Sequence, residues 1–500
     1  MSVRENLDAI TCACAQSQGF DVLILSVANS AQAAFWRARL AETLSAIGHA
    51  WATLYVVHED WPGGAGNGLG TLYAWQKANE QALASGHPSL MERLCRGESV
   101  ALYHTAGKGT RLAPLPGSEE NNKPAVKLPV PIPSGSGVFA YTLLEAVIKQ
   151  TVLFAPVRKG RLSVFWGDQI FIPSRGLQNL SSYAVDIIGQ VLSPPIDRAL
   201  WEARNLSAYG LLAIDSASQS AQQLEKIDFA TMRSLVEKDA IHISGGMAVS
   251  LGSFGLSAEF LALLLEEFQT ELQRQSTKMD ADPHFWMPLT LDLQTYQEIM
   301  AKKGLPFSAA EAHWQRIQRL IPRLSSRARV GVQDVGQETL WWDFGTVSKY
   351  FENCLKLVGE GSESEAMRQF FEVGQAYDPA TQTLMIESSA PIERVRRSVL
   401  FRTQTDGYST VEDSVVIGSR LTASRLSRNL VYQAEINGAL DAEEVVSGAR
   451  DAEGKAIQLY TTLRNNGQLD WFRRLPKNTV SYDELYQIND RRAFSGLGVS

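Results

Sequence analysis

A run of small residues, followed by cations, begins near residue 104 of the 500-residue chain. It reads His104-Thr105-Ala106-Gly107-Lys108-Gly109-Thr110-Arg111-Leu112, and Lys123-Pro124 follows after a short gap. The mostly apolar residues 99–103 just before it predict a buried strand. Small residues let backbone N–H groups approach phosphate oxygens, and lysine or arginine neutralises the remaining charge. The pattern therefore predicts a loop that holds a polyphosphate, with an ordinary glycine turn as the alternative.

Two carboxylates further along the chain could hold a metal ion beside such a loop. Asp168 follows Gly167 after the apolar segment 162–166, and Asp343 lies in the aromatic stretch 341–346. A carboxylate at the carboxyl end of a parallel strand is well placed for Mg²⁺ that bridges nucleotide phosphates. Taken singly, each also has a structural interpretation. Asp168 could cap the next turn, and Asp343 could cap a helix over 346–357.

The elements that would position these residues alternate along the first 170 residues. Strands are expected over 22–25, 53–57, 99–103 and 162–166, and helices over 31–47, 71–84 and 138–150, with a Pro-, Gly- and Ser-rich segment at 128–137. Such alternation favours an α/β fold with a doubly wound, mostly parallel sheet of Rossmann-like type. Ligands of such sheets lie beyond the carboxyl ends of the strands, where the loop and Asp168 fall.

The bulk composition narrows the class of protein. The net charge of −7 disfavours a general nucleic-acid surface, and no stretch of 18 apolar residues is present to cross a membrane. No secretory signal is visible at the N-terminus. The four cysteines are too few and scattered for a disulfide framework, which predicts free thiols and a cytoplasmic location. The length predicts two or three domains.

Six short motifs, taken in order, resemble those of the sugar-1-phosphate nucleotidyltransferases, the NDP-sugar pyrophosphorylases. They are the G-x-G-T-R-L-like loop 106–112, Lys123-Pro124, Gly167-Asp168, Tyr209-Gly210, Glu225-Lys226 and the W-x-D-x-G-T segment 341–346. Two positions depart from the family pattern: Ala106 replaces the first glycine of the loop, and Ile227 replaces a proline after the Glu-Lys pair. Glu237-Lys238 is a rival for that pair.

The region before the loop resembles one branch of this family, the fucose-1-phosphate guanylyltransferases. That branch carries a G-N-G-x-x-T segment, which here is Gly66 to Thr71, and a histidine ahead of its loop, as at His104. A kinase-like phosphate loop is the rival interpretation of the glycine run 63–70, but the run lacks the Gly-Lys-Ser/Thr ending. The loop itself follows the glucose-1-phosphate pattern more closely. Fucose-1-phosphate with GTP and glucose-1-phosphate with UTP or ATP therefore both stay open.

The resemblance implies a GT-A-like nucleotidyltransferase domain and a Mg²⁺-dependent reaction. A sugar-1-phosphate would attack the α-phosphorus of a nucleoside triphosphate and release pyrophosphate. The implied catalytic residues are Arg111, Lys123 and Asp168, and the metal ligands are Asp168 and Asp343. The nucleotide would contact Gly66, Asn67, Gly68, Gly70, Thr71, Ala106, Gly107, Lys108, Gly109 and Thr110, and the sugar phosphate would contact Tyr209, Gly210, Glu225, Lys226, Gly245 and Gly246.

Two further interpretations accompany this assignment. A non-catalytic sugar-nucleotide sensor or regulatory subunit with the same fold is the alternative function. Asp280 and Asp282 are interpreted as part of a solvated turn, with a sugar or metal contact as the alternative.

The C-terminal third loses the alternating pattern. Short β-rich pieces from about residue 391, with Ile-Gly and Asn-Gly turns, resemble the left-handed β-helix that many nucleotidyltransferases carry. We expect a catalytic domain over 1–358, with a nucleotide-binding half at 1–175 and a sugar-phosphate half at 176–358. A linker or helical connection over 359–390, a β-helix-like domain over 391–470 and a tail over 471–500 would follow. The resemblance also implies homo-oligomer contacts through the C-terminal domain.

Overall fold

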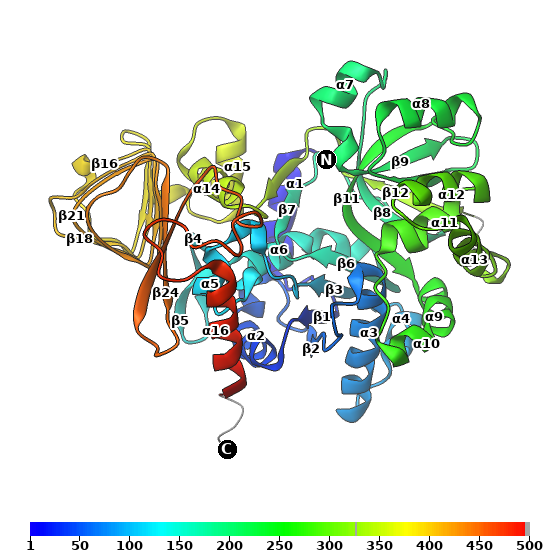
Figure 1. Cartoon of the computed structure of the whole chain (residues 1–500), viewed down its shortest axis with the longest axis horizontal. Helices are drawn as coiled ribbons and strands as arrows, with labels where there is room; N and C mark the ends of the chain where they lie inside the picture. The colour runs from blue at the N-terminus through cyan, green and yellow to red at the C-terminus, as the bar shows by residue number, and fades with distance from the viewer. Residues whose placement is uncertain (326–327, 496–500) are drawn as a thin grey trace.

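The computed structural model describes residues 1–325 and 328–495, and its centre is a nine-stranded sheet (Figure 1). Seven strands follow the order β10-β9-β11-β6-β3-β1-β2, while β8 pairs with β11 and with β12. The bounds are β1 Val22–Val27, β2 Thr53–His58, β3 Val100–His104, β6 Arg161–Trp166, β8 Tyr183–Val191, β9 Gly210–Asp215, β10 Ser220–Glu225, β11 Gly246–Ser257 and β12 Ala328–Asp334.

This sheet is mixed, which corrects the expectation of a mostly parallel one. The neighbours β2, β1, β3 and β6 are parallel, as the alternation of the first 170 residues predicts. Beyond them, β11 runs antiparallel to β6, β8 and β9, and β9 and β10 form an antiparallel pair. The prediction of parallel strands failed after residue 175 because it extended the alternation of strands and helices in the first part of the chain to a region with a different pattern. In that region several neighbouring strands run in opposite directions.

Helices cover both faces of the parallel half, so the α/β class is confirmed. In β1, Leu23 and Leu25 pack in one core cluster with Trp36 of α2, and Ile24 packs in the other cluster with Leu72 of α3. This follows from the two-residue period of a strand, which sends successive side chains to opposite faces. Helix α2 Ser30–Thr43 therefore lies in the layer on one face of the sheet, and α3 Gly66–Ala84 lies in the layer on the other face.

The remaining helices lie around the sheet and at its ends. They are α1 Val3–Ala15, α4 Leu90–Cys95, α5 Leu115–Ser118, α6 Leu143–Thr151, α7 Arg198–Ala203, α8 Phe229–Glu237, α9 Ala258–Glu267, α10 Gln269–Arg274, α11 Met287–Thr290, α12 Leu293–Lys302, α13 Phe307–Gln318, α14 Val347–Leu355, α15 Ser362–Phe370 and α16 Tyr482–Ser495. None of the helices in the described ranges is long and apolar enough to cross a membrane.

Two small antiparallel pairs connect distant parts of the chain. One joins β7 Gln169–Ile172 to β13 Leu340–Asp343, and the other joins β4 Lys127–Ser134 to β5 Gly137–Thr142. The β5 strand corrects the helix expected over 138–150. The helix α6 begins only at Leu143, because Thr142 and Glu145 form a capping box there, while the β-branched and aromatic residues before it favour a strand.

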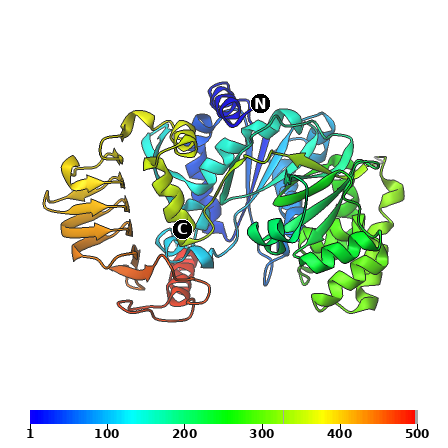
Figure 2. The same cartoon turned by 90° about the horizontal axis from the view of Figure 1, so that it is seen from above.

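The C-terminal part is rich in stacked parallel strands (Figure 2). Register pairs Leu384 with Val399, Val399 with Val415, Val415 with Leu430 and Leu430 with Val445, so each turn takes 15 or 16 residues. The strands are β14 Tyr377–Asp378, β15 Thr383–Ile386, β16 Val395–Arg396, β17 Val399–Phe401, β18 Gln404–Thr405, β19 Thr410–Glu412, β20 Val415–Ile417, β21 Arg420–Ser427, β22 Leu430–Tyr432, β23 Glu435–Ala439, β24 Glu444–Arg450 and β25 Ala456–Thr462. A β-rich C-terminal region is therefore confirmed. A left-handed coil, the domain boundaries and oligomer contacts stay predictions.

The segment expected as a tail packs onto the phosphate-loop region. Trp471, Tyr482 and Leu485 share a buried cluster with Ala113 and with Leu459 of β25. Figure 1 shows α16 beside α5, the short helix that follows the loop. Residues 496–500 of the expected tail lie outside the described residues.

A buried ion cluster between β8 and the start of β6 provides a test of the fold. Asp186 of β8 pairs with Arg158 and lies 2.8 Å from Arg161 Nη2, and all three side chains are at most 2% exposed. Asp186→Ala would leave two guanidinium groups buried without their carboxylate. We expect a loss of about 3–5 kcal/mol in the free energy of unfolding, measured by urea titration.

The exposed pair between Arg233 and Glu237 provides the control. Glu237→Ala should cost less than about 1 kcal/mol. Equal effects of the two substitutions would contradict the structural role assigned to Asp186.

Candidate active site

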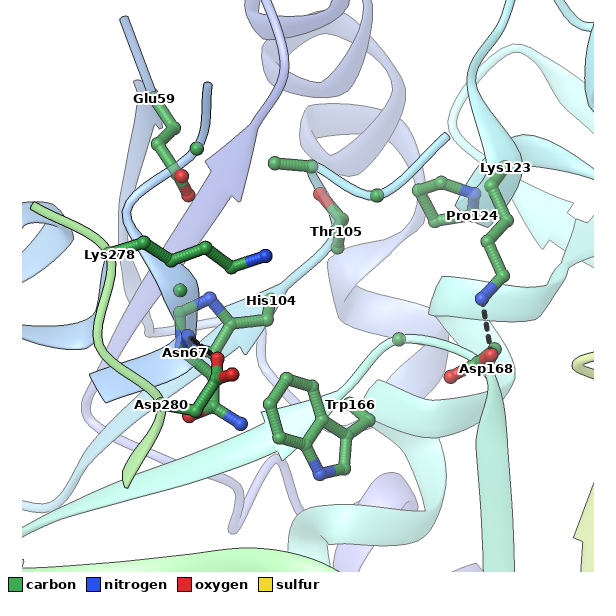
Figure 3. Close-up of a pocket in the computed structure, with 15 residues that line it drawn as sticks. Glu59, Asn67, His104, Thr105, Lys123, Pro124, Trp166, Asp168, Lys278 and Asp280 are labelled. Carbon is green, nitrogen blue, oxygen red and sulfur yellow. Dashed lines mark hydrogen bonds and ion pairs between the residues drawn. The ribbon is translucent and has the colours of Figure 1, made fainter. Parts of the chain in front are cut away.

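A cavity of about 350 Å³ opens at the carboxyl ends of the parallel strands (Figure 3). His104 ends β3, Trp166 ends β6, and Glu59 follows β2. This is the edge at which sheets of this kind bind ligands. The lining residues are Glu59, Gly64, Gly66, Asn67, His104, Thr105, Ala106, Gly107, Lys123, Pro124, Trp166, Gly167, Asp168, Lys278 and Asp280.

The predicted phosphate loop contributes its first half to this cavity. Thr105 is fixed to β1, because its N–H and its hydroxyl both donate to the Ser26 carbonyl, at 3.0 and 2.6 Å. Ala106 and Gly107 line the cavity after it. Gly109 has a φ of +67°, and a Cβ there would lie 2.9 Å from Lys123 Cγ. The glycine at position 109 therefore makes room for the lysine side chain rather than for a ligand.

Of the cations predicted to bind the nucleotide, only Lys123 lines the cavity. Lys108 Nζ lies 4.9 Å from the ring centroid of Tyr486 in α16, a cation–π contact. Arg111 lines a different cavity, and Gly109 and Thr110 also lie outside the lining of the first one. Arg111 and Lys123, both predicted to be catalytic, thus line different cavities in this structure.

The C-terminal helix holds the chain between Arg111 and Lys123. Asn121 Nδ2 donates to the Tyr486 carbonyl at 2.8 Å and to Asp490 Oδ1 at 2.9 Å. Asn489 Nδ2 donates to the Gly117 carbonyl at 2.8 Å and to Asn121 Oδ1 at 3.0 Å. Asn121 and Asn489 are buried, so losing one amide would leave its partner unsatisfied. The helix α16 thus fixes the spacing of the two loop cations.

The two predicted metal carboxylates lie close together. Pairing of β7 with β13 places Asp343 opposite Gln169, and the Phe344 N–H donates to the Asp168 carbonyl at 3.0 Å. A Cβ at Gly345 would lie 2.9 Å from Asp343 Oδ1, 3.4 Å from Asp168 Oδ2 and 3.8 Å from Arg111 Nη2. A side chain at 345 would crowd the Asp343 carboxylate, and both carboxylates and the guanidinium of Arg111 surround this glycine.

Each carboxylate has a lysine partner. Asp168 forms an ion pair with Lys123, and Asp343 Oδ2 lies 2.6 Å from Lys349 Nζ. The described residues contain no group of three or more His, Cys, Asp or Glu placed to hold a metal ion. Two carboxylates with phosphate oxygens are nevertheless a donor set that suits Mg²⁺, which binds through one or two carboxylates and keeps its other positions for phosphates and water.

The glycine segment at the start of α3 serves a different purpose from the expected one. The N–H groups of Gly68 and Leu69 donate to the Met279 carbonyl, at 2.9 and 3.2 Å. A Cβ at Gly66 would lie 2.5 Å from the same oxygen. Gly66 and Asn67 line the cavity, while Gly68, Gly70 and Thr71 do not. The glycines admit the backbone of a distant segment, which occupies donors that sequence reasoning assigned to the nucleotide.

That distant segment, residues 278–282, contains Asp280, for which a sugar or metal contact is the alternative to a solvated turn. Lys278 and Asp280 line the cavity. Asp280 Oδ1 accepts the Asn67 N–H at 3.0 Å, and Asn67 Oδ1 accepts the Ala281 N–H at 2.5 Å. Asp280 is half-buried and bonded to Asn67, which favours the alternative interpretation, a ligand contact, over a solvated turn. The acidic cluster before a proline was the available signal, but nothing in the sequence paired it with the glycine segment.

Glu59, His104 and Trp166 are three further lining residues outside the predicted set. Burial raises the pKa of the Glu59 carboxyl, whose Oε1 accepts the Ala65 N–H at 2.9 Å. His104 stacks on Trp166 with ring centroids 5.3 Å apart, and its Nε2 lies 2.8 Å from the Thr71 hydroxyl. In Figure 3, Glu59 and Lys278 extend into the cavity on the side opposite to Lys123 and Asp168.

Four of the six predicted sugar-phosphate residues come together. Register places Gly210 opposite Glu225, and the Lys226 N–H donates to the Tyr209 carbonyl at 3.2 Å. Lys226 Nζ lies 2.6 Å from Glu225 Oε1, a hydrogen bond that raises the pKa of the lysine. The Tyr209 ring lies 6.0 Å from that of Trp341, two residues before Asp343. This group therefore adjoins the strand that carries a metal carboxylate.

Gly245 and Gly246 lie elsewhere. Gly246 pairs with Ile214, and the Gly245 N–H donates to the Ile214 carbonyl at 2.7 Å, near the end of β9 opposite to Gly210. Their assignment rested on the weakest motif. The rival pair Glu237-Lys238 makes surface ion pairs with Arg233 and Glu298 around the end of α8. The geometry favours Glu225-Lys226 over it.

Comparison with known proteins adds little to this geometry. No protein-family model matches the chain, and no curated protein matches it. A solved structure described as mannose-1-phosphate geranyltransferase from Thermus thermophilus is similar at 15% identity, covering 79% of this chain and 99% of that one, with a TM-score of 0.28. A likeness that low carries no argument, so the site is interpreted from its own residues.

The setting of His104 generates a prediction about protonation. Burial lowers the pKa of its imidazole to about 4, below the usual value near 6.5. In the unfolded chain the imidazole is protonated already below about pH 6.5, whereas in the folded protein it stays neutral down to about pH 4. His104 therefore lowers the free energy of unfolding as the pH drops from about 6.5 towards 4. We expect imidazole NMR signals of His104 to stay those of the neutral ring down to about pH 5.

Protonation of His104 near pH 6.5 would contradict its placement in a desolvated cavity wall. His104→Gln would identify its signals.

Proposed function

We propose that this chain is a sugar-1-phosphate nucleotidyltransferase. It would transfer a nucleoside monophosphate from a nucleoside triphosphate to a sugar-1-phosphate and release pyrophosphate. The observation that carries the proposal is that Asp168 and Lys123 line one end of a cavity, with Asp343 next to Asp168 just outside its lining. The group Tyr209, Gly210, Glu225 and Lys226 also lies outside the lining and adjoins the strand of Asp343 through the contact between the Tyr209 and Trp341 rings. Phosphate chemistry needs such a combination of carboxylates and cations, and a sugar-phosphate ligand needs a second cation beside it.

The reaction is a nucleophilic substitution at the α-phosphorus of the nucleoside triphosphate. A phosphate oxygen of the sugar-1-phosphate forms the new P–O bond, and the bond to the bridging oxygen of pyrophosphate breaks with its electron pair leaving on pyrophosphate. No general base is needed, because a phosphate monoester is already ionised near neutral pH. Both reactants are anions, so the protein's main tasks are charge neutralisation and alignment.

The residues take roles that follow from their places. Lys123 would leave Asp168 and neutralise the phosphate oxygens on which charge increases. Lys226, oriented by Glu225, would bind the phosphate of the sugar substrate. Mg²⁺ held by Asp168 and Asp343 would polarise the α-phosphate when bound. Arg111 would have to turn from its own cavity to reach the outer phosphates.

Asp168→Asn tests this proposal. Pyrophosphate release is measured over a panel of nucleoside triphosphates and sugar-1-phosphates with Mg²⁺. We expect release by the wild type with at least one pair, and a loss of at least about 100-fold in kcat for the variant, since removing one charge-stabilising group typically costs this much. The circular dichroism of the two proteins should be the same.

Asp8→Asn, an exposed position on α1, is the matched control and should retain full activity. Wild-type turnover by Asp168→Asn would remove Asp168 from the site. Absence of pyrophosphate release with every pair, together with tight binding of an NDP-sugar, would instead favour a sensor that keeps the fold without the reaction.

The end of the cavity away from Lys123 favours guanine as the base. Guanine presents two N–H donors beside the O6 acceptor, whereas adenine presents an acceptor nitrogen beside its amino group. The Glu59 carboxylate can accept from the guanine donors, and Lys278 beside it can donate to O6. Adenine would turn a lone pair towards the carboxylate, which leaves both groups unpaired. GTP is therefore expected in preference to ATP.

Glu59→Gln should narrow the preference for GTP over ATP by about 10-fold or more in kcat/KM, because one good base contact is worth roughly 1–3 kcal/mol of discrimination. The readout is pyrophosphate release with each nucleotide in turn. Glu92→Gln, in the exposed capping box of α4, is the control and should leave the ratio unchanged. An unchanged ratio in Glu59→Gln would remove this residue from base selection.

A further inference from the structure

A second cavity, of about 410 Å³, lies between the loop, the start of α14 and the C-terminal β-rich region. We call it the arginine cleft. Three arginines line it, one from each of three separate segments. The full lining is Arg111, Thr346, Ser348, Glu352, Arg428, Glu443, Leu463, Arg464, Asn465 and Asn466. The proposed reaction uses only Arg111 of this set.

One carboxylate orients two of the guanidinium groups. Glu443 Oε1 accepts from Arg428 Nε at 3.2 Å, and Glu443 Oε2 accepts from Arg464 Nε at 2.5 Å. In the part of the chain that the structure describes, neither guanidinium group has another hydrogen bond or ion pair. The terminal nitrogens of both are thus available, and the Arg428 guanidinium also lies 5.7 Å from the Phe351 ring centroid.

The charges of the cleft leave an excess of donors. Two guanidiniums against one carboxylate leave a positive charge, and each guanidinium has N–H groups that Glu443 does not use. Arg111 adds a third guanidinium and makes no hydrogen bond or ion pair within residues 1–325 and 328–495. The remaining carboxylate, Glu352, accepts from the Ser348 hydroxyl at 3.3 Å. The chain as a whole has a net charge of −7, so this concentration of cations is local.

The N-terminal end of α14 adds to the positive electrostatic potential of the cleft. Thr346 caps this helix by accepting the Lys349 N–H at 3.2 Å, and both Thr346 and Ser348 line the cleft. The positive end of the α14 dipole therefore lies at the wall of the cleft. Planar guanidinium forks beside such a helix end suit the oxygens of a phosphate.

We propose that the arginine cleft binds a phosphate-containing anion, either a phosphate monoester or a diphosphate, at a site separate from the substrate cavity. Glu443 is a positioning residue that holds two forks towards the ligand. Arg111 belongs to both the cleft and the loop, and its Nη2 lies near the Asp168 and Asp343 carboxylates. An anion in the cleft would retain Arg111 there and thereby weaken binding of a nucleoside triphosphate. This last consequence rests on the proposed function, while the binding site itself does not.

Calorimetric titration with inorganic phosphate, and separately with pyrophosphate, tests the site. We expect at least one of these anions to bind the wild type at millimolar concentrations or below. Arg428→Gln and Arg464→Gln should each weaken that binding by about 10-fold, as expected for loss of a charge-assisted contact. Arg420→Gln, another exposed arginine of the β-rich region that donates to Gln404 at 2.9 Å, should have no effect.

Lys123→Ala distinguishes the cleft from the substrate cavity. Binding that persists in Lys123→Ala but weakens in the two cleft variants supports the proposal. Binding lost in Lys123→Ala and unchanged in the cleft variants would overturn it, as would the absence of binding to the wild type. None of these results depends on turnover, so a protein without pyrophosphate release still tests the cleft.

A kinetic measurement tests the coupling through Arg111. If turnover is observed, phosphate should raise the KM for the nucleotide in the wild type, and this effect should shrink in Arg428→Gln and Arg464→Gln while their basal kcat stays unchanged. Equal inhibition of all three proteins would place the inhibitory phosphate in the substrate cavity.

Discussion

The short pairing of β7 with β13 is the constraint on which the site depends. These strands bring Asp168 and Asp343, far apart in the sequence, to adjacent positions, and both carboxylates lie around Gly345. Two carboxylates so close repel each other unless cations balance them. Lys123 and Lys349 do so here, which explains why Lys123 lies against Asp168 rather than free in the cavity. A bound metal would replace the lysines as the source of positive charge and free Lys123 for phosphate.

The loop between these charges depends on the far end of the chain. Asn121 and Asn489 bond to each other and to the backbone on both sides, so α16 acts as a support for residues 112–122. The same helix holds Lys108 by a ring contact, and residues 463–466 form one wall of the arginine cleft beside Arg111. The loop therefore connects the substrate cavity to the C-terminal region through side chains of the loop itself. That connection is the physical basis for linking an anion in the cleft to events at the carboxylates.

The sequence predicted local elements well where a short-range signal exists. Strands β1, β2, β3 and β6 follow from apolar runs, and Asp168 was placed at a strand end for that reason. Contacts between residues far apart in the sequence were harder to predict. No single segment of the sequence indicates that the Met279 carbonyl lies beside Gly66 or that Asn489 lies beside Asn121. The same is true of the antiparallel half of the sheet. Glycines were the most misleading residues, because a glycine admits a ligand, a lysine side chain or a distant backbone equally well, as Gly66 and Gly109 show.

A crystal structure of the protein with Mg²⁺ and an unreactive nucleoside triphosphate analogue tests the central claim most directly. Our account predicts a metal ion at about 2.0–2.1 Å from oxygens of both Asp168 and Asp343, with Lys123 Nζ moved from Asp168 to a phosphate oxygen. The base would lie towards Glu59 and Lys278. An intact pair between Lys123 and Asp168, with the analogue bound elsewhere or without metal at either carboxylate, would contradict it.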